Sequence, residues 1–394
     1  MTENLKFAVV GVGIMGSSHV RDLSQSEDIA LAAICDIDPQ RAQAAAAPHG
    51  VPAYTDYKEM IAKEKLDGII IATPHYFHTP IAIYAMQHGV NVLCEKPEAV
   101  HVKDARKMND AYAEAKKKYP NLIFAIMFQN RTFGMYAKLK EMITSGELGK
   151  LVRVSWIITT WFRNQSYYDN GGWRATWSGE GGGVLLNQCP HNLDLYQWLV
   201  GLPNKVTGYA AIGKYHNIEV EDEVTAFFQH ENGMVGHFIT TTAESPGSNR
   251  LEIVAENGKV VMEDEKIFFT RNQMSMFEHL RTSPDLFAKV PNETVEVPFD
   301  HSRELGRHII VTEAFAAAIR DPKSPLIAAG PEGIRGLSIG NAIMLSSWLG
   351  RPVDLPLDED LYEAKLMELV ANSRFQKTVT GSGTVVDVGA SLLK

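Results

Sequence analysis

The run Leu5-Lys6-Phe7-Ala8-Val9-Val10 is followed directly by Gly11-Val12-Gly13-Ile14-Met15-Gly16. The first six residues are almost continuously apolar, which is typical of a parallel strand buried on both faces. The glycines then follow at G-x-G-x-x-G spacing, and a helical pattern starts at once. Glycine at these positions allows a tight turn, a close backbone approach to a pyrophosphate and close packing of a helix on a strand. The stretch therefore predicts a strand, a phosphate-binding turn and a helix whose free N–H groups face the phosphates.

A second apolar run, Ile29–Cys35, ends on Asp36, about 20 residues past the last glycine. In a dinucleotide site this carboxylate would accept hydrogen bonds from the adenosine ribose and repel a 2′-phosphate, which favours NAD over NADP. Arg41, one helical turn further on, leaves NADP open as a second cofactor. The alternative role for Asp36 is to cap the next helix, but Asp38, beside Pro39, suits that cap better.

Strand-like and helix-like segments alternate from residue 5 to residue 127. This alternation predicts a doubly wound parallel sheet, so we assign residues 1–128 to a Rossmann-type dinucleotide-binding domain. Beyond the first two strands, the expected strands are Asp67–Ala72, Val90–Cys94 and Leu122–Phe128, and the expected helices include His75–His88 and Val102–Lys118.

The strand Val90–Cys94 stops abruptly on Glu95, Lys96 and Pro97. Open α/β sheets bind ligands just outside the carboxyl ends of their strands, so Lys96 is expected to lie between a dinucleotide and a substrate. The turn Thr73-Pro74-His75 and the nearby His78 follow another strand end, and we expect both histidines to be positioning or packing residues.

Composition and charge narrow the class of protein. The 394 residues suffice for about two or three domains, and the 45% apolar share can fill a sizeable core. A net charge of −9, with both signs mixed, argues against a nucleic-acid binder, and no apolar run approaches the ~18 residues of a membrane span. The three cysteines lie far apart at no metal-ligand or redox spacing, so we expect no metal site and a reducing, cytoplasmic location. No signal-peptide pattern precedes the first strand.

The pattern changes after residue 128, where strands dominate. We predict a second α/β domain over residues 129–394, built on a large, mostly antiparallel open sheet that binds the substrate. Glu-Asn-Gly turns at residues 231–233 and 256–258 would join consecutive strands as hairpins, whereas residues 270–300 are expected to form a loop. One apolar face of this sheet would be exposed in a monomer, so we expect a homo-oligomer, either a dimer or a tetramer.

Residues 161–191 mix aromatic side chains with Arg, Asn and Gln in a glycine-rich segment. Flat rings can stack on the C–H faces of a sugar while fixed donors and acceptors bind its hydroxyls, so we predict a sugar or polyol site. The alternative is a packed loop with satisfied polar groups. Gln129 and Arg131 follow the last strand of the first domain and are expected to lie where the two domains meet.

Three motifs in this order resemble one family. They are Gly11-Val-Gly13-Ile-Met-Gly16, the tripeptide Glu95-Lys96-Pro97, and Gly181-Gly-Gly183 leading to His191 and Asp194. The chain is similar along its whole length to the glucose–fructose oxidoreductase/inositol dehydrogenase/rhizopine-catabolism family. The resemblance implies NAD(P)-dependent oxidation or reduction of sugars or polyols, catalysis by the lysine together with the histidine, and a cis peptide before Pro97.

The sequence departs from that family at Asn187, where an aspartate is common. An asparagine can hydrogen-bond a hydroxyl or the imidazole ring, but it cannot take a proton. Pro190 implies that a helix begins or kinks beside His191, and Asp194, three residues on, would share its face and supply the orienting carboxylate.

The reaction expected from these residues is oxidation of a secondary hydroxyl of a sugar, glycoside or cyclic polyol. Catalysis is assigned to His191 as general base and Lys96 as the group that binds the developing alkoxide, or to the same pair with exchanged roles, together with Asn187. The residues predicted to contact the cofactor are Gly11, Gly13, Ile14, Met15, Gly16, Asp36, Arg41, Thr73, Pro74, His75, His78, Glu95, Lys96 and Gln129. Those predicted to contact the substrate are Lys96, Arg131, Trp161, Arg163, Tyr167, Trp173, Arg174, Trp177, Asn187, His191 and Asp194.

Two other functions compete with this interpretation. Some members of the family resemble NAD-dependent glycosidases, which oxidise a sugar transiently, eliminate the aglycone and return the hydride, and Lys96 and His191 would serve that reaction too. A non-catalytic NAD- or sugar-sensing protein on the same fold would need neither residue. Net reduction of added NAD would separate the dehydrogenase from the glycosidase.

Overall fold

A parallel sheet of six strands forms the first half of the molecule. The computed structural model describes residues 4–303 and 308–373. The strand order is β3-β2-β1-β4-β5-β6, which reverses direction between β1 and β4 as in a dinucleotide-binding sheet. Its strands are β1 (Leu5–Val10), β2 (Ile29–Cys35), β3 (Ala53–Tyr54), β4 (Gly68–Ile71), β5 (Asn91–Cys94) and β6 (Phe124–Ile126).

Helices connect these strands and cover both faces of the sheet, as the alternating pattern predicts. They are α1 (Ile14–Ser24), α2 (Pro39–Ala46), α3 (Tyr57–Lys63), α4 (His78–Gln87) and α5 (Val102–Lys118), with short 3-10 turns η1 (Ala47–His49) and η2 (His75–Phe77). The expected Rossmann fold is therefore confirmed.

The second half is built on a sheet of nine strands in the order β14-β13-β12-β11-β7-β10-β9-β8-β15. All neighbouring pairs are antiparallel except β7 with β10, so the mostly antiparallel sheet is confirmed. The turns at residues 231–233 and 256–258 join β9 to β10 and β11 to β12 as predicted. The strands are β7 (Leu151–Ile158), β8 (Lys205–Ile212), β9 (Glu221–Gln229), β10 (Val235–Thr241), β11 (Asn249–Ala255), β12 (Gly258–Glu263), β13 (Lys266–Asn272), β14 (Asn292–Glu296) and β15 (Val353–Asp354).

Residues 270–300 are not the loop that the sequence predicts. β13 runs to Asn272, helix α9 (Met276–Thr282) follows, and β14 extends the edge of the sheet. The side chains of β14 are all exposed, so this strand is held by backbone pairing with β13 rather than by burial. A hydrophobic period cannot indicate such a strand.

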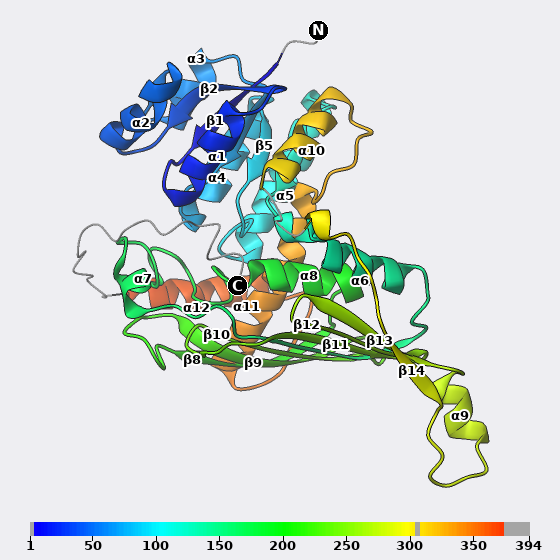
Figure 1. Ribbon diagram of the computed structural model, residues 1–394. Coiled ribbons are helices and arrows are strands. Elements are labelled where there is room, and N and C mark those ends of the chain that lie inside the picture. The colour runs from blue at the N-terminus through cyan, green and yellow to red at the C-terminus, as the bar shows by residue number, and fades with distance from the viewer. Residues whose placement is uncertain (1–3, 304–307, 374–394) are drawn as a thin grey trace.

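Four helices separate the two sheets. Figure 1 shows α6 (Gly134–Thr144), α8 (Pro190–Val200), α11 (Gly333–Leu349) and α12 (Glu359–Ala371) on the side of the second sheet that faces the first. α11 packs on both α8 and β8. The 3-10 turn η3 (Gln129–Thr132) and the short helix α7 (Gln165–Asp169) lie at the loops between these layers.

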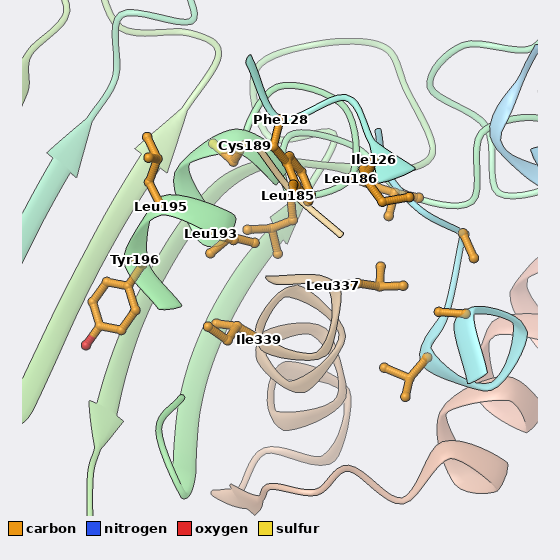
Figure 2. Close-up of a cluster of buried hydrophobic side chains, with 14 of the residues drawn as sticks. Ile126, Phe128, Leu185, Leu186, Cys189, Leu193, Leu195, Tyr196, Leu337 and Ile339 are labelled. Atoms are coloured by element: carbon orange, nitrogen blue, oxygen red, sulfur yellow. The ribbon is translucent and has the colours of Figure 1, made fainter. Parts of the chain in front are cut away.

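One apolar core runs from the edge of the first sheet into the second half. In Figure 2, Ile126 and Phe128 at the end of the first sheet meet Leu185 and Leu193, with Leu337 of α11 below them. Because the same core supports the end of β6 and the start of α8, it sets the position of the functional groups that follow each of them.

The chain returns to the first sheet late in the sequence. Helix α10 (His308–Arg320) packs against α1 and β5, and η5 (Gly330–Glu332) contacts β6. Phe315 of α10 lies 5.5 Å, ring centre to ring centre, from Phe7 of β1. The domain boundary at residue 128 therefore stays a prediction, because part of the assigned second domain completes the core of the first.

No helix among the described residues is long and apolar enough to cross a membrane. On the outer face of the second sheet Tyr209 is 70% exposed and Ile212 45% exposed. The homo-oligomer expected to cover this face stays a prediction.

Replacement of Phe315 by alanine should destabilise the protein by about 3–5 kcal/mol, because it opens a cavity beneath the first sheet. Phe315 is fully buried, whereas Phe287 is 89% exposed, so Phe287→Ala is the matched control and should stay within about 0.5 kcal/mol of the parent. Urea unfolding followed by tryptophan fluorescence measures both. Equal stability of the two variants would show that α10 is not part of the core.

Candidate active site

The turn between β1 and α1 has the geometry of a phosphate cradle. Gly11 has a φ of +86°, and a Cβ there would lie 2.8 Å from the Ala72 carbonyl oxygen. A Cβ on Gly16 would lie 1.8 Å from the Gly11 oxygen. A Cβ on Gly13 would meet no atom within 4 Å, and its φ of −69° suits any residue. The fold therefore requires Gly11 and Gly16, whereas the open space at Gly13 leaves room for a ligand close to the backbone.

The first turn of α1 has no side chain that caps its N–H groups. Gly13 and Ile14 are exposed and Met15 is partly exposed at this end of the helix. Uncapped N–H groups and the helix dipole attract anions, so these residues fit the pyrophosphate of a dinucleotide.

Asp36 is held rigidly at the end of β2. Its carboxylate accepts the backbone N–H of Val12 at 2.9 Å and that of Asp38 at 3.0 Å, and Arg41 donates to it at 3.2 Å. Asp38 caps α2, as the sequence predicts. The contact of Asp36 with a ribose stays a prediction. The Arg41 side chain is 52% exposed beside it. Ile37, which the sequence analysis overlooked, is 85% exposed here and offers an apolar surface for an adenine ring.

Histidine 78 joins two loops at the carboxyl edge of the sheet. Its ring nitrogens lie 2.9 Å from the carbonyl oxygen of Thr73 and 2.8 Å from that of Pro97. A neutral imidazole can donate to one of these two oxygens, which agrees with a positioning role. The Thr73 hydroxyl in the same turn is buried without a partner among the described residues, so it is free to bind a ligand.

Glu95 does not hold the side chain of Lys96. Its carboxylate lies 2.8 Å from the imidazole of His19 and accepts the backbone N–H of Lys96 at 3.2 Å. Burial alone would raise the pKa of Glu95, but the hydrogen bond and charge of His19 outweigh burial and lower it to about 2. Glu95 therefore stays ionised and fixes the backbone at the start of the Lys96 turn, where the peptide before Pro97 is cis.

The Lys96 ammonium group reaches into the second half of the molecule. Nζ donates to the carbonyl oxygen of Asn187 at 2.8 Å. Burial lowers the pKa of this half-buried lysine; the charges of Arg174 and Arg163 act in the same direction, and those of Glu95 and Glu180 oppose it. Only one of its three N–H donors is used by this contact, which leaves donors for a ligand.

His191 lies in the first turn of α8, which begins at Pro190 as predicted. Its Nε2 is 3.4 Å from the side-chain nitrogen of Gln129, and its Nδ1 is buried without a partner among the described residues. Burial, followed by the charge of Lys96, lowers the pKa of His191 well below its ordinary value. The imidazole is therefore neutral near pH 7 and able to accept a proton.

The loop over residues 161–177 presents aromatic rings and guanidinium groups beside Lys96. Five of the residues predicted to contact substrate are half-buried in it, and that contact stays a prediction: Trp161, Arg163, Tyr167, Trp173 and Arg174. Arg174 lies 4.7 Å from the ring centre of Trp173, and the ring of Trp173 lies 5.5 Å from that of His75. Trp177, by contrast, is buried and packs on Trp348, so its contact with substrate stays a prediction.

Arg131 and Asp194 are structural residues, contrary to the prediction that they bind substrate. The guanidinium group of Arg131 donates to both oxygens of Asp194 at 2.6 and 2.8 Å and to Glu332 at 2.7 Å. Asp194 also accepts from Gln197 and forms no hydrogen bond with His191. Asp194 does lie three residues after His191 on the same helix, as predicted. The guanidinium group of Arg131, in the neighbouring turn, is a stronger partner for its carboxylate than the imidazole.

Glu180 is the site residue that the sequence analysis overlooked. It is buried, accepts the backbone N–H of Ala175 at 2.5 Å and accepts a short hydrogen bond from the side-chain amide of Asn187. The backbone oxygen of Glu180 lies 3.2 Å from the ring of His75. The carboxylate absent at position 187 is therefore supplied from seven residues earlier. The sequence did offer a signal for Glu180, because the acidic residues between 161 and 191 are Asp169 and Glu180.

Two models of known protein families match this chain. A family model described as an oxidoreductase family with an NAD-binding Rossmann fold, GFO/IDH/MocA, matches residues 5–121. The model for the GFO/IDH/MocA C-terminal domain matches residues 136–261. The chain belongs to the GFO/IDH/MocA family. Its first half is accordingly an NAD-binding Rossmann domain.

Similar curated members of the GFO/IDH/MocA family are named inositol 2-dehydrogenase. The protein from Salmonella typhimurium is 34% identical over 153 residues, which cover 38% of this chain and 44% of the relative. The protein from Corynebacterium glutamicum strain R is 27% identical over 240 residues, which cover 60% of this chain and 66% of the relative. The chain thus matches less than two thirds of either relative.

Solved structures extend the likeness over most of the chain. The WlbA dehydrogenase from Bordetella pertussis, solved with NADH and UDP-GlcNAcA, has a TM-score of 0.75 and 27% identity, over 90% of this chain and 100% of that one. Levoglucosan dehydrogenase, solved with NADH and levoglucosan, has a TM-score of 0.73 and 22% identity over 90% of this chain and 100% of that one, and shows the fold alone.

Exchange of two glycines by alanine should separate cofactor binding from folding. Gly13→Ala should leave stability unchanged but weaken NADH binding roughly tenfold or more, because the methyl group fills the phosphate cradle. Gly16→Ala should cost more than about 1 kcal/mol of stability, because its methyl group meets backbone. NADH fluorescence titration and thermal unfolding measure the two effects. Normal NADH affinity in Gly13→Ala would place the pyrophosphate elsewhere.

Proposed function

We propose that the protein is an NAD-dependent dehydrogenase that oxidises a secondary hydroxyl of a sugar, glycoside or cyclic polyol. The observation that carries this proposal is the convergence of Lys96 and His191. Lys96 follows a strand of the first sheet and His191 begins a helix that packs on the second. The Lys96 ammonium is bound by the backbone only four residues before His191, and its charge acts on the imidazole.

NAD, when bound, supplies the hydride acceptor for such an oxidation. The residues that would hold it are the Gly11–Gly16 turn for the pyrophosphate and Asp36 for the ribose. The Thr73 hydroxyl, a buried polar atom without a partner among the described residues, fits the nicotinamide end of the cofactor. The amide of that end has both a donor and an acceptor to match a hydroxyl.

His191 would act as the general base. Its neutral ring has one nitrogen with a lone pair. The neighbouring Gln129 can determine which of the two ring nitrogens this is. If the Gln129 amide is turned by 180°, its oxygen accepts the Nε2–H and Nδ1 keeps the lone pair that removes the hydroxyl proton. This arrangement gives a partner to the otherwise unsatisfied Gln129 oxygen.

Lys96 would bind the substrate oxygen as negative charge develops on it. Its ammonium retains N–H donors beyond the one that binds Asn187. Glu95 holds the backbone of Lys96 itself. Glu180 holds Asn187, whose carbonyl oxygen accepts from the ammonium group. A donor fixed before the reaction stabilises the alkoxide without reorganising, which is the usual source of such catalysis.

Removal of either group should abolish most of the activity. In Lys96→Met and His191→Ala, kcat for NADH formation on the best sugar or polyol should fall by about 10²- to 10⁴-fold. Thermal unfolding of both variants should show that the fold is retained. The exposed residues Lys117 and His49 provide the controls Lys117→Met and His49→Ala, which should keep parental turnover.

Parental turnover in Lys96→Met or in His191→Ala would remove that residue from the mechanism. Accumulation of NADH in proportion to oxidised sugar supports a dehydrogenase. Release of an aglycone without net NADH would support the glycosidase reaction instead.

The pH dependence should identify the base. The pKa of His191 lies well below its ordinary value, so kcat/KM for oxidation should rise along an acidic limb and stay level through neutral pH. It should fall again at alkaline pH, earlier than for a solvated lysine, as Lys96 loses its proton. Lys96→Met should lose this alkaline limb. A rate that instead climbs through the alkaline range to a plateau would make Lys96 the base.

A further inference from the structure

Arg163 and Arg174, called here the arginine pair, stand apart from the other buried or half-buried arginines. Neither forms an ion pair with a carboxylate of the described residues. Among the described residues, the other buried or half-buried arginines are Arg131, Arg153 and Arg250, and each forms an ion pair with Asp or Glu. A guanidinium group carries five N–H donors, and each member of the pair uses one of them for a protein atom, the Phe162 carbonyl oxygen or the Tyr167 hydroxyl.

Aromatic rings hold the arginine pair in place. Tyr167 lies between them, with its ring centre 5.2 Å from the guanidinium carbon of Arg163 and 4.8 Å from that of Arg174. Arg174 also covers Trp173 at 4.7 Å, and Arg163 lies 5.9 Å from Trp161. Stacking of this kind fixes the plane of a guanidinium group while its N–H edge stays open, which suits bidentate binding of an anion.

The pair belongs to the site of Lys96. Arg174 donates to the Tyr167 hydroxyl at 2.8 Å, which in turn lies 3.5 Å from the side-chain oxygen of Asn187. The backbone of Asn187 binds the Lys96 ammonium. One hydrogen-bonded chain therefore runs from Arg174 to the proposed catalytic lysine.

Positive charge is concentrated on the substrate side of this chain. Three cations, Lys96, Arg163 and Arg174, share the half-buried space. Of the nearby carboxylates, Glu95 is hydrogen-bonded to His19 and Glu180 to Ala175 and Asn187. Half-buried like charges repel one another, and a bound anion would offset that cost.

We propose that the substrate is an anionic sugar, whose carboxylate or phosphate is bound by Arg163 and Arg174 while a ring hydroxyl lies against Lys96. This inference rests on the proposed function for the hydroxyl and adds the charge of the substrate. A neutral glycoside would stack on the same rings but leave both guanidinium groups without an anionic partner.

The test compares sugars that differ in charge. The probes are methyl β-D-glucopyranoside, the corresponding methyl glucuronide and glucose 1-phosphate, each assayed for NADH formation and for binding to the NADH-loaded protein by calorimetry. An anionic probe should have a kcat/KM about ten- to a hundredfold above that of the glucoside. Its KM should rise with added salt, whereas that of the glucoside should not. The ratio of kcat/KM for the glucuronide to kcat/KM for glucose 1-phosphate identifies the preferred anion.

Variants assign the preference to the arginine pair. Arg163→Gln and Arg174→Gln should raise KM for the anionic probe about ten- to a hundredfold more than they raise KM for the glucoside. Arg174→Lys keeps the charge but loses the planar pair of N–H donors. Its KM for the anionic probe should lie between those of the glutamine variants and the parent. Arg281→Gln, on the exposed helix α9 far from the site in Figure 1, is the matched control and should behave as the parent.

The outcomes separate the two proposals. Anion binding that depends on Arg174, without turnover of any probe, would support the arginine pair and contradict the dehydrogenase. Turnover or binding of the glucoside equal to that of both anionic probes would overturn the anionic substrate and leave the dehydrogenase intact. An equal loss for charged and neutral probes in Arg163→Gln and Arg174→Gln would also overturn it, because the arginines would then only support Tyr167.

Discussion

The hydrogen bond from the Lys96 ammonium to the carbonyl oxygen of Asn187 is the contact on which the site depends. It spans 2.8 Å and joins residues 91 positions apart, one at the edge of the first sheet and the other just before α8. A half-buried ammonium needs such an acceptor, because it has lost much of its hydration. The loop that ends at Asn187 must therefore lie against the end of β5, and this brings His191 and the aromatic segment to the same place.

Two kinds of polar contact surround this bond. Arg131 and Asp194 form a buried, doubly hydrogen-bonded pair that ties η3 to α8 and is completed by Glu332. Removal of one partner from such a pair leaves a buried charge, so the pair makes the position of α8 definite. His191 in the first turn of the same helix has a free nitrogen instead. The first half of the helix thus carries one side chain, Asp194, whose partners fix the helix and another, His191, that is free to react.

Several of the unsatisfied groups lie on one side of the molecule. The open space at Gly13, the uncapped start of α1 and the lone Thr73 and Gln129 oxygens lie along the carboxyl edge of the first sheet. The arginine pair lies beyond Lys96 on the loop of the second half. Polar groups are normally paired when they are buried, so this distribution describes the outline of the ligands: a dinucleotide on one side of Lys96 and, by our proposal, an anionic sugar on the other.

The sequence by itself determined the local features of this protein. Apolar period and glycine spacing predicted the Rossmann half, and Pro190 predicted the start of α8, because strands, turns and helix ends depend on neighbouring residues. Only the tertiary structure decided which polar groups pair across long separations. Asp194 shares a helix face with His191, yet it binds Arg131, and Glu180 takes the place of a carboxylate at Asn187. The sequence did not predict the edge strand β14 either, because none of its side chains is buried and it depends on pairing with β13. Spacing along the chain gives the direction of a side chain, whereas its partner depends on which other segments the fold brings within reach.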